Sequence, residues 1–280
     1  MFKSILVCTD GSKYGDTARE YGIHLAQRVG ARLAGLHVMD SRMLEGPLMA
    51  DISGWVGASP YAAQLPQFRE LLREKGEAVA QAFRARAEEL GTSADVSVRT
   101  GHPVPLIIEE ARKAELLVIG QKGEHADFIG EMTGSTAERV SRHAERPCLV
   151  TPAEFRPITR ILAAYDGSGH AGKALELAAE LSSALAAPLA LLAVDEKGDS
   201  ERVREALAAG LQLARDHGVA ADGVTAAGKA GAAVLRVAEE KGCDLIAVGA
   251  FGHSRIREFF IGSAAAQISA RAHCPVLMAR

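Results

Sequence analysis

Residues 4–38, SILVCTDGSKYGDTAREYGIHLAQRVGARLAGLHV, decide the fold because they recur later in the chain. Residues 160–194 read RILAAYDGSGHAGKALELAAELSSALAAPLALLAV, so Asp10 corresponds to Asp166. Each copy runs from a short apolar segment through Asp-Gly-Ser into a stretch with helical periodicity, and then into a second apolar segment. A repeat of half the chain length predicts two similar domains rather than a solenoid.

The repeat continues further along the chain, where LLVIGQKGE (116–124) corresponds to LIAVGAFGH (245–253). Corresponding residues of the two copies are separated by fewer positions along the chain here than at Asp10 and Asp166, so the first half carries an extra segment between its second and fourth strands. Residues 40–67, rich in glycine and proline, are the candidate. The large apolar side chains of this segment favour a packed flap or a homodimer contact over a nucleotide lid; they are Met43, Met49, Trp55 and Tyr61.

Strands and helices alternate in both halves. In the second half we expect strands at 161–165, 188–194, 222–227, 244–249 and 275–279, with helices at 170–186 and 201–218, a third ending at Lys241 and a fourth starting near Gly262. This alternation predicts an α/β fold of two tandem, doubly wound, five-stranded parallel sheets with strand order 3-2-1-4-5. The expected domains are 1–151 and 158–280. The linker TPAEFRP (151–157) is too short for free movement of the domains.

Composition narrows the function. The formal net charge is −3 and charged residues make up 24% of the chain, so no strong field attracts nucleic acid or an anionic membrane. Apolar runs are of strand length, too short for a membrane span or a signal peptide. The four cysteines and nine histidines form no metal or disulfide pattern. These features predict a cytoplasmic protein.

One motif carries chemistry. GAFGHSRIREFFIGS (249–263) spaces Gly249, Gly252 and Gly262 as G-x2-G-x9-G, followed by Ser263. Because glycine has no β-carbon, a ligand can approach the backbone closely at these positions. Gly262 and Ser263 begin a helix, where free N–H groups and the dipole favour a phosphate.

Topology brings this motif to a second one. Asp166-Gly167-Ser168 follows the first strand of its half and the glycine motif follows the fourth. Strands one and four are neighbours in the order 3-2-1-4-5, at the point where ligands bind in such sheets. Val194 ends the next strand and can meet an adenine edge with its backbone.

These elements resemble the universal stress protein family, in its ATP-binding subclass, across nearly all of both halves. The resemblance implies an adenine-nucleotide alpha-hydrolase-like fold, with adenine and ribose at strands one and two and triphosphate on the glycine loop. The implied second site consists of Asp166, Val194, Gly249, Gly252, His253, Gly262 and Ser263. The implied first site consists of Asp10, Val38, Gly120, Gly123, Gly134 and Ser135.

The first loop departs from the pattern. Ten residues, not nine, separate Gly123 from Gly134, and the loop is net negative because of Glu124, Asp127 and Glu131. The second loop is net positive, through Arg255 and Arg257. We therefore expect ATP to prefer the second site, while Mg²⁺ can bridge acids and phosphates in the first.

Plainer roles stay open for these residues. The glycines can serve turns alone, the two aspartates can be helix caps, and His253 can be a solvated loop residue. Among functions, we expect an ATP-binding stress-response or regulatory protein with little rapid hydrolysis. The alternatives are a slow ATP-hydrolysing or adenylating enzyme of the same superfamily, or an interaction scaffold. A P-loop motif, the S-G-G-x-D-S loop and an evident base for attacking water are all absent from the sequence.

The final strand of each half leaves an edge bare. PCLV (147–150) and PVLMA (275–279) are apolar and uncharged, and such edges are usually covered. We expect the two edges to pair in antiparallel fashion and to form an internal pseudo-dimer, as the resemblance also implies.

Overall fold

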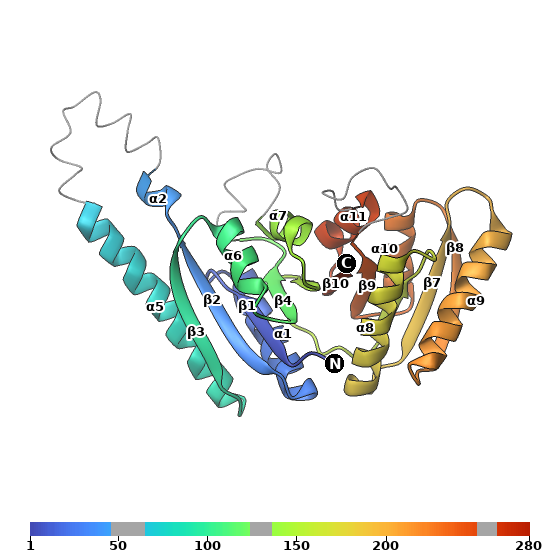
Figure 1. Cartoon of the computed structure of the whole chain (residues 1–280), viewed down its shortest axis with the longest axis horizontal. Coiled ribbons are helices and arrows are strands. Elements are labelled where there is room, and N and C mark those ends of the chain that lie inside the picture. Colours follow the sequence, from blue (N-terminus) through green and yellow to red (C-terminus); the bar gives the residue numbers. More distant parts are fainter. Residues whose placement is uncertain (46–64, 124–135, 251–261) are drawn as a thin grey trace, which may run out of the picture.

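The computed structural model describes residues 1–45, 65–123, 136–250 and 262–280. The strands of these residues form one continuous sheet in the order β3-β2-β1-β4-β5-β10-β9-β6-β7-β8. Helices cover both faces of the sheet, and the two halves lie side by side along it (Figure 1).

The two halves repeat the same succession of elements. The first contains β1 (Ser4–Cys8), α1 (Lys13–Val29), β2 (Arg32–Asp40), α2 (Arg42–Glu45), α5 (Leu65–Glu89), β3 (Ala94–Gly101), α6 (Pro103–Ala111), β4 (Leu116–Gly120), α7 (Thr136–His143) and β5 (Cys148–Thr151). The second contains β6 (Ile161–Ala164), α8 (Gly169–Leu185), β7 (Leu189–Asp195), α9 (Ser200–Asp216), β8 (Ala221–Ala227), α10 (Ala230–Glu240), β9 (Leu245–Gly249), α11 (Ser263–Arg271) and β10 (Val276–Ala279).

Within each half the strands are parallel. β1 pairs with β2 on one side and with β4 on the other, and β6 pairs likewise with β7 and β9. This confirms the predicted α/β class and the order 3-2-1-4-5. The elements of the second half begin and end within two residues of the predicted bounds; α9 ends at Asp216, and Gly218 follows its cap with a φ of 75°.

The inner strands are apolar on both sides because both faces are covered, whereas the edge strands β3 and β8 are largely exposed or half-buried. Ile5 and Val7 of β1 belong to one buried cluster, whereas Leu6 and Cys8 belong to the cluster on the opposite face. This division follows the alternation of side chains along a strand. Both clusters run through both halves, so the core is continuous across the junction.

The halves meet at their final strands. β10 pairs with β5 in antiparallel fashion, with Leu277 opposite Leu149 and Val276 opposite Val150. Leu149 and Leu277 are 1% and 0% exposed. Each strand therefore covers the apolar edge that the other would leave open.

The linker between the halves is held against α1. The Thr17 hydroxyl donates to the Ala153 carbonyl at 3.1 Å, and the Arg156 N–H donates to the Tyr21 hydroxyl at 3.1 Å. The Phe155 ring lies edge-on to Tyr21 with centroids 4.7 Å apart. Burial, the main cause, raises the pKa of Tyr21 to about 12, so its hydroxyl stays protonated. These contacts fix the linker to the first half, and restricted domain movement stays a prediction.

The extra segment of the first half is only partly described. It includes α2 and the start of α5, which has 25 residues where its counterpart α9 has 17. The amino end of α5 projects away from the sheet (Figure 1), and Leu71 there is 63% exposed. Met43 is exposed, while Met49, Trp55 and Tyr61 lie outside the described residues.

Candidate functional site

The candidate sites lie at the carboxyl ends of neighbouring strands. β1 and β4 are adjacent in the first half, and β6 and β9 are adjacent in the second. In each half the chain leaves these two strands in opposite directions across the sheet, which opens a crevice between their ends. Asp10 follows β1, and Asp166 follows β6.

Each aspartate organises the turn that leads into the next helix. Asp10 Oδ1 accepts from the Ser12 N–H at 3.0 Å, and Asp166 Oδ1 accepts from the Ser168 N–H at 2.9 Å. The intervening Gly11 and Gly167 have φ values of 79° and 82°, a conformation that favours glycine.

The serines, not the aspartates, cap the helices. The Ser12 hydroxyl accepts from the Gly15 N–H and the Ser168 hydroxyl from the Ala171 N–H, both at 3.2 Å. The aspartates are therefore not the helix caps, and each directs one carboxylate oxygen into the turn.

In the first half the two motifs are in contact. A β-carbon added at Gly123 would lie 3.0 Å from Asp10 Oδ2, and one added at Gly15 would lie 2.7 Å from Asp10 Oδ1 and from the Thr9 hydroxyl. The Asp10 carboxylate is thus enclosed by backbone from both sides and is half-buried, whereas Asp166 is exposed. Gly15 corresponds to Ala171 in the second half, and sequence reasoning did not single it out.

The glycines that end the fourth strands have a packing role. A β-carbon at Gly120 would lie 2.8 Å from the backbone of Tyr14, and one at Gly249 would lie 2.8 Å from the Ala171 nitrogen. The first turn of α1 or α8 occupies the space on this side of each glycine, and the predicted contact of the same glycines with a ligand stays a prediction. The glycine is needed because this turn crosses directly over the strand end.

The second glycine motif closes on itself. The Gly262 N–H donates to the Ala250 carbonyl at 2.9 Å, which joins the start of α11 to the end of β9. Gly262 is the N-cap, and among the described residues no side chain caps α11. Ser263 at its start is exposed. N–H groups in the first turn of a helix without a side-chain cap favour an anion, which is what the sequence predicted for this position.

Val38 and Val194 lie near the ends of β2 and β7, next to the two aspartate turns. Both are half-buried against the apolar cluster that also contains Leu36 and Leu192. Gly134, Ser135, Gly252 and His253 lie outside the described residues. Groups of three or more metal-ligating side chains do not occur in the described parts of the chain.

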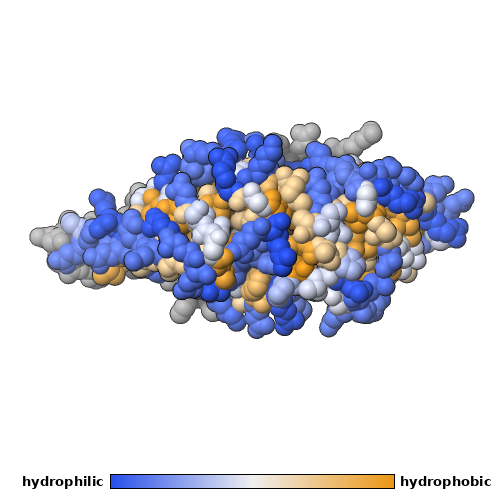
Figure 2. All heavy atoms as spheres, turned by 90° about the horizontal axis from the view of Figure 1, so that it is seen from below, coloured by the Kyte–Doolittle hydropathy of each residue, from blue (hydrophilic) through white to orange (hydrophobic). Residues whose placement is uncertain are grey.

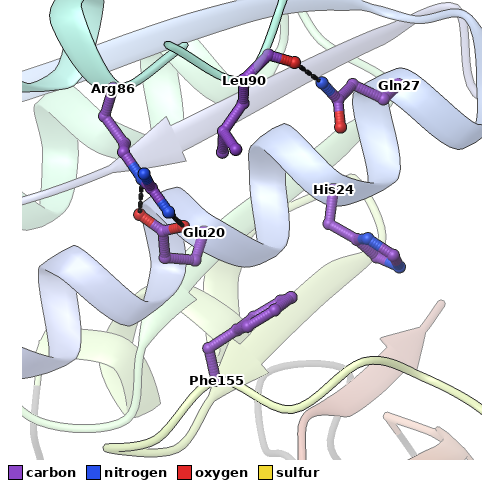
Figure 3. A pocket seen from close by; sticks show the side chains of 6 residues that line it. All are labelled: Glu20, His24, Gln27, Arg86, Leu90 and Phe155. Atoms are coloured by element: carbon purple, nitrogen blue, oxygen red, sulfur yellow. Dashed lines mark hydrogen bonds and ion pairs between the residues drawn. The ribbon is translucent and has the colours of Figure 1, made fainter.

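A separate pocket lies at the opposite ends of the strands from the candidate sites. Its volume is about 190 Å³, and it lies between α1, the carboxyl end of α5 and the linker. Figure 3 shows the Arg86 guanidinium paired with Glu20 on one side and His24 facing Phe155 on the other. Figure 2 views the molecule from this side, where apolar surface runs along the centre between polar side chains. The pocket is remote from the glycine motifs because α1 runs back along the sheet.

One residue of the first glycine loop was not predicted. Gln121, between Gly120 and Gly123, directs its side chain to the other half and donates to the Ser269 carbonyl of α11. Sequence periodicity contains no signal for this contact, because the two residues are far apart in the chain.

The comparisons with known proteins agree with this architecture. The model of the universal stress protein family matches residues 1–152 and again residues 157–280. Universal stress protein Slr1230 from Synechocystis is 30% identical over 286 residues, which cover 99% of this chain and 100% of that protein. The crystal structure of a universal stress protein from Archaeoglobus fulgidus has a TM-score of 0.77 at 22% identity and covers 99% of this chain and 96% of that one.

Fold and repeat define a tandem of two doubly wound α/β halves, in which the strand order reverses once in each half. The chain belongs to the universal stress protein family, as the two matches to its model show. None of the helices in the described residues is long and apolar enough to cross a membrane.

Proposed function

We propose that the chain binds ATP at both crevices, more tightly in the second half, and hydrolyses it far more slowly than enzymes do. The observation that carries the proposal is the bond from the Gly262 N–H to the Ala250 carbonyl. It holds the start of α11 beside the strand end that α8 also touches, and no side chain among the described residues caps the first N–H groups of this helix.

In the second site Asp166 and Val194 receive ribose and adenine, while Gly262 and Ser263 receive the triphosphate together with Gly252 and His253. In the first site the same roles fall to Asp10 and Val38, and to Gly123, Gly134 and Ser135. Gly120 and Gly249 line the first and the second site, and they also allow the helix starts to approach the strand ends.

The two sites differ in charge and enclosure. The first loop carries more acids than bases and the second carries more bases than acids. The half-buried Asp10 also adds a carboxylate beside the Gly123 backbone. Triphosphate without a metal ion therefore prefers the second site, and Mg²⁺ strengthens binding at the first.

Replacing Gly262 with Val tests the second site. The branched side chain occupies the place where phosphate approaches the first turn of α11, so ATP affinity there falls at least tenfold, or about 1.4 kcal/mol. Calorimetric titration measures affinity and stoichiometry. Ala270→Ser, at an exposed position in the last turn of the same helix, is the matched control and keeps both. Unchanged affinity and stoichiometry in Gly262→Val would contradict the assignment.

Turnover separates a binding protein from an enzyme. The described residues of the crevices supply N–H donors but no side chain placed to activate water, so steady-state hydrolysis stays well below about 1 s⁻¹. A rate between about 1 and 10³ s⁻¹ that Ser263→Ala abolishes would establish an ATPase instead.

The wider setting belongs to the same proposal. Residues 1–151 and 158–280 act as two domains joined through their final strands, and nucleotide occupancy regulates a stress response. Four free cysteines support a reducing cytoplasm. The whole chain also dimerises through residues 40–67. Light scattering of the whole chain and of a variant lacking that segment tests this, and only the whole chain is expected to form a dimer.

A further inference from the structure

We infer that the two nucleotide sites are coupled, and that Gln121 transmits the occupancy of the first site to α11 of the second. This inference rests on the proposed ATP binding and adds regulation to it. It starts from a contact that no repeat of the sequence predicts.

Gln121 belongs to the first site by its backbone. It directly follows β4, and its N–H donates to the Thr151 carbonyl of β5 at 2.9 Å. Two residues later, Gly123 lies against the Asp10 carboxylate. A ligand that orders the backbone between Gly120 and Gly123 therefore orders Gln121 as well.

The side chain of Gln121 belongs to the other half. Its amide nitrogen donates to the Ser269 carbonyl at 2.5 Å and lies 3.5 Å from the Ala272 carbonyl. Ser269 is in the last turn of α11 and Ala272 is its C-cap. Carbonyls at a helix end lack intrahelical partners, so a donor there stabilises the final turn.

α11 connects this contact to the second site. The helix has nine residues, Ser263–Arg271, and is about 13 Å long at 1.5 Å per residue. Its other end is tied to β9 through Gly262 and Ala250. A helix this short moves as a unit, so fixing its carboxyl end restricts the N–H groups that receive phosphate.

A second contact runs in the opposite direction. The Arg280 guanidinium donates to the Arg142 carbonyl at 2.6 Å, near the end of α7. Arg280 follows Ala279, whose carbonyl accepts from the Ala250 N–H of the second site at 2.7 Å. Each short helix that follows a glycine loop is therefore held at its carboxyl end by a side chain of the other half.

The first contact is not a product of repeat symmetry. Gln121 corresponds to Ala250, whose methyl group has no donor, and Arg280 corresponds to Pro152. The two halves thus use different residues to reach each other, although the strands around them match. Occupancy of one site reduces the ordering that the other ligand must still bring about, so the coupling is positive and reciprocal.

The test measures ATP binding at the second site with the first site open or blocked. Gly123→Val blocks the first site, because the added side chain meets the Asp10 carboxylate. With Gln121 present, blocking weakens the second site at least about fivefold, the lower range of such couplings. In Gln121→Glu, which keeps the shape but cannot donate to a carbonyl, the ratio falls to about one.

Hydrogen exchange supplies an independent measurement. In Gly262→Val, ATP binds only the first site, and it slows exchange of the α11 amides near Ser269 across the junction. Gln121→Glu abolishes this slowing, whereas Ala270→Ser retains it. The coupling alone is overturned if ATP binds at both sites but Gln121→Glu changes neither the exchange pattern nor the ratio of second-site affinities with the first site open and blocked. A failure of ATP to bind at either site overturns the proposed function together with the coupling.

Discussion

In the first half, Phe83 of α5 packs over Gly35 of β2; in the second half, Leu191 of β7 packs over Gly210 of α9. A β-carbon at Gly35 would lie 3.0 Å from Val96 and 3.2 Å from the Phe83 ring, and one at Gly210 would lie 2.7 Å from Leu191 Cδ2. Gly35 and Leu191 occupy the same strand position, since they lie opposite Val7 and Ala163. The first half therefore has the large residue on the helix and the glycine on the strand, and the second half has the reverse.

A second exchange occurs under α1 and α8. A β-carbon at Gly22 would lie 2.2 Å from Val7 Cγ2, so the first half combines a large strand residue with a glycine. The second half places Ala163 and Ala178 at these positions, and both are fully buried. What the halves share is therefore close packing at each contact and not the residues that make it, because a close-packed interior tolerates neither a void nor an overlap.

The largest expected effect tests the contact that the halves make with each other. Leu149→Glu and Leu277→Glu each bury a charge between paired strands, so each lowers the free energy of unfolding by about 3 kcal/mol or more. Because Leu149 and Leu277 lie opposite each other, the two variants lose similar amounts. Urea unfolding measures the loss, and light scattering detects association through the opened edges.

Leu71→Glu is the control for this pair of variants, because Leu71 is 63% exposed and the change costs within about 0.5 kcal/mol. Equal stability of Leu277→Glu and Leu71→Glu would show that the final strands do not support each other.

An intermediate effect tests the exchange of large and small residues. Phe83→Ala leaves a cavity and costs about 3–5 kcal/mol, and Gly35→Leu overfills the contact and costs about 1–3 kcal/mol. The double variant imports the arrangement of the second half, so it loses less than the sum of the single losses. A double-mutant cycle in urea measures the difference. Additive losses would mean that Gly35 and Phe83 do not compensate each other.

The smallest effect concerns His24 and its counterpart Glu180. Glu180 pairs with the Met1 amino group at 2.6 Å, whereas the His24 ring packs edge-on to Phe155 of the linker with centroids 5.8 Å apart. Burial, and secondly Arg28, lowers the pKa of His24 from 6.5. The unfolded chain therefore takes up this proton first as pH falls. The stability that neutral His24 contributes is complete above pH 6.5 and decreases below it.

His24→Phe keeps a ring against Phe155 and removes the titration. Its thermal midpoint therefore falls less than that of the unaltered protein between about pH 7 and about pH 5. Parallel curves for the two proteins over this range would exclude a contribution from His24.

The sequence predicted the elements and their order well, because each rests on local patterns. Alternating buried strands, Ser12 and Ser168 before helices, and Gly218 after one are all signals within a few residues. The neighbourhood of Asp10 and Gly123 followed from strand order alone. The positions of Gly134, Ser135, Gly252 and His253 stay predictions.

Other features required knowledge of which residues meet. We assigned the two glycines that end the fourth strands to a ligand, and the sequence contains no sign that α1 and α8 also pack across these strand ends. A glycine looks the same in a sequence whether the nearby atom belongs to a ligand or to a helix. Only the distances to Tyr14 and Ala171 reveal the packing role.

By itself the sequence determined that this protein has two doubly wound halves, with an Asp-Gly-Ser turn and a glycine loop in each. Tertiary structure alone decided how the halves differ inside a shared outline. Phe83 compensates Gly35, Gln121 reaches α11, and the Arg280 guanidinium holds α7. The physical reason is that hydrogen-bonding patterns and side-chain periodicity act over a few residues, whereas volume and donor–acceptor pairing are satisfied between residues far apart in the chain.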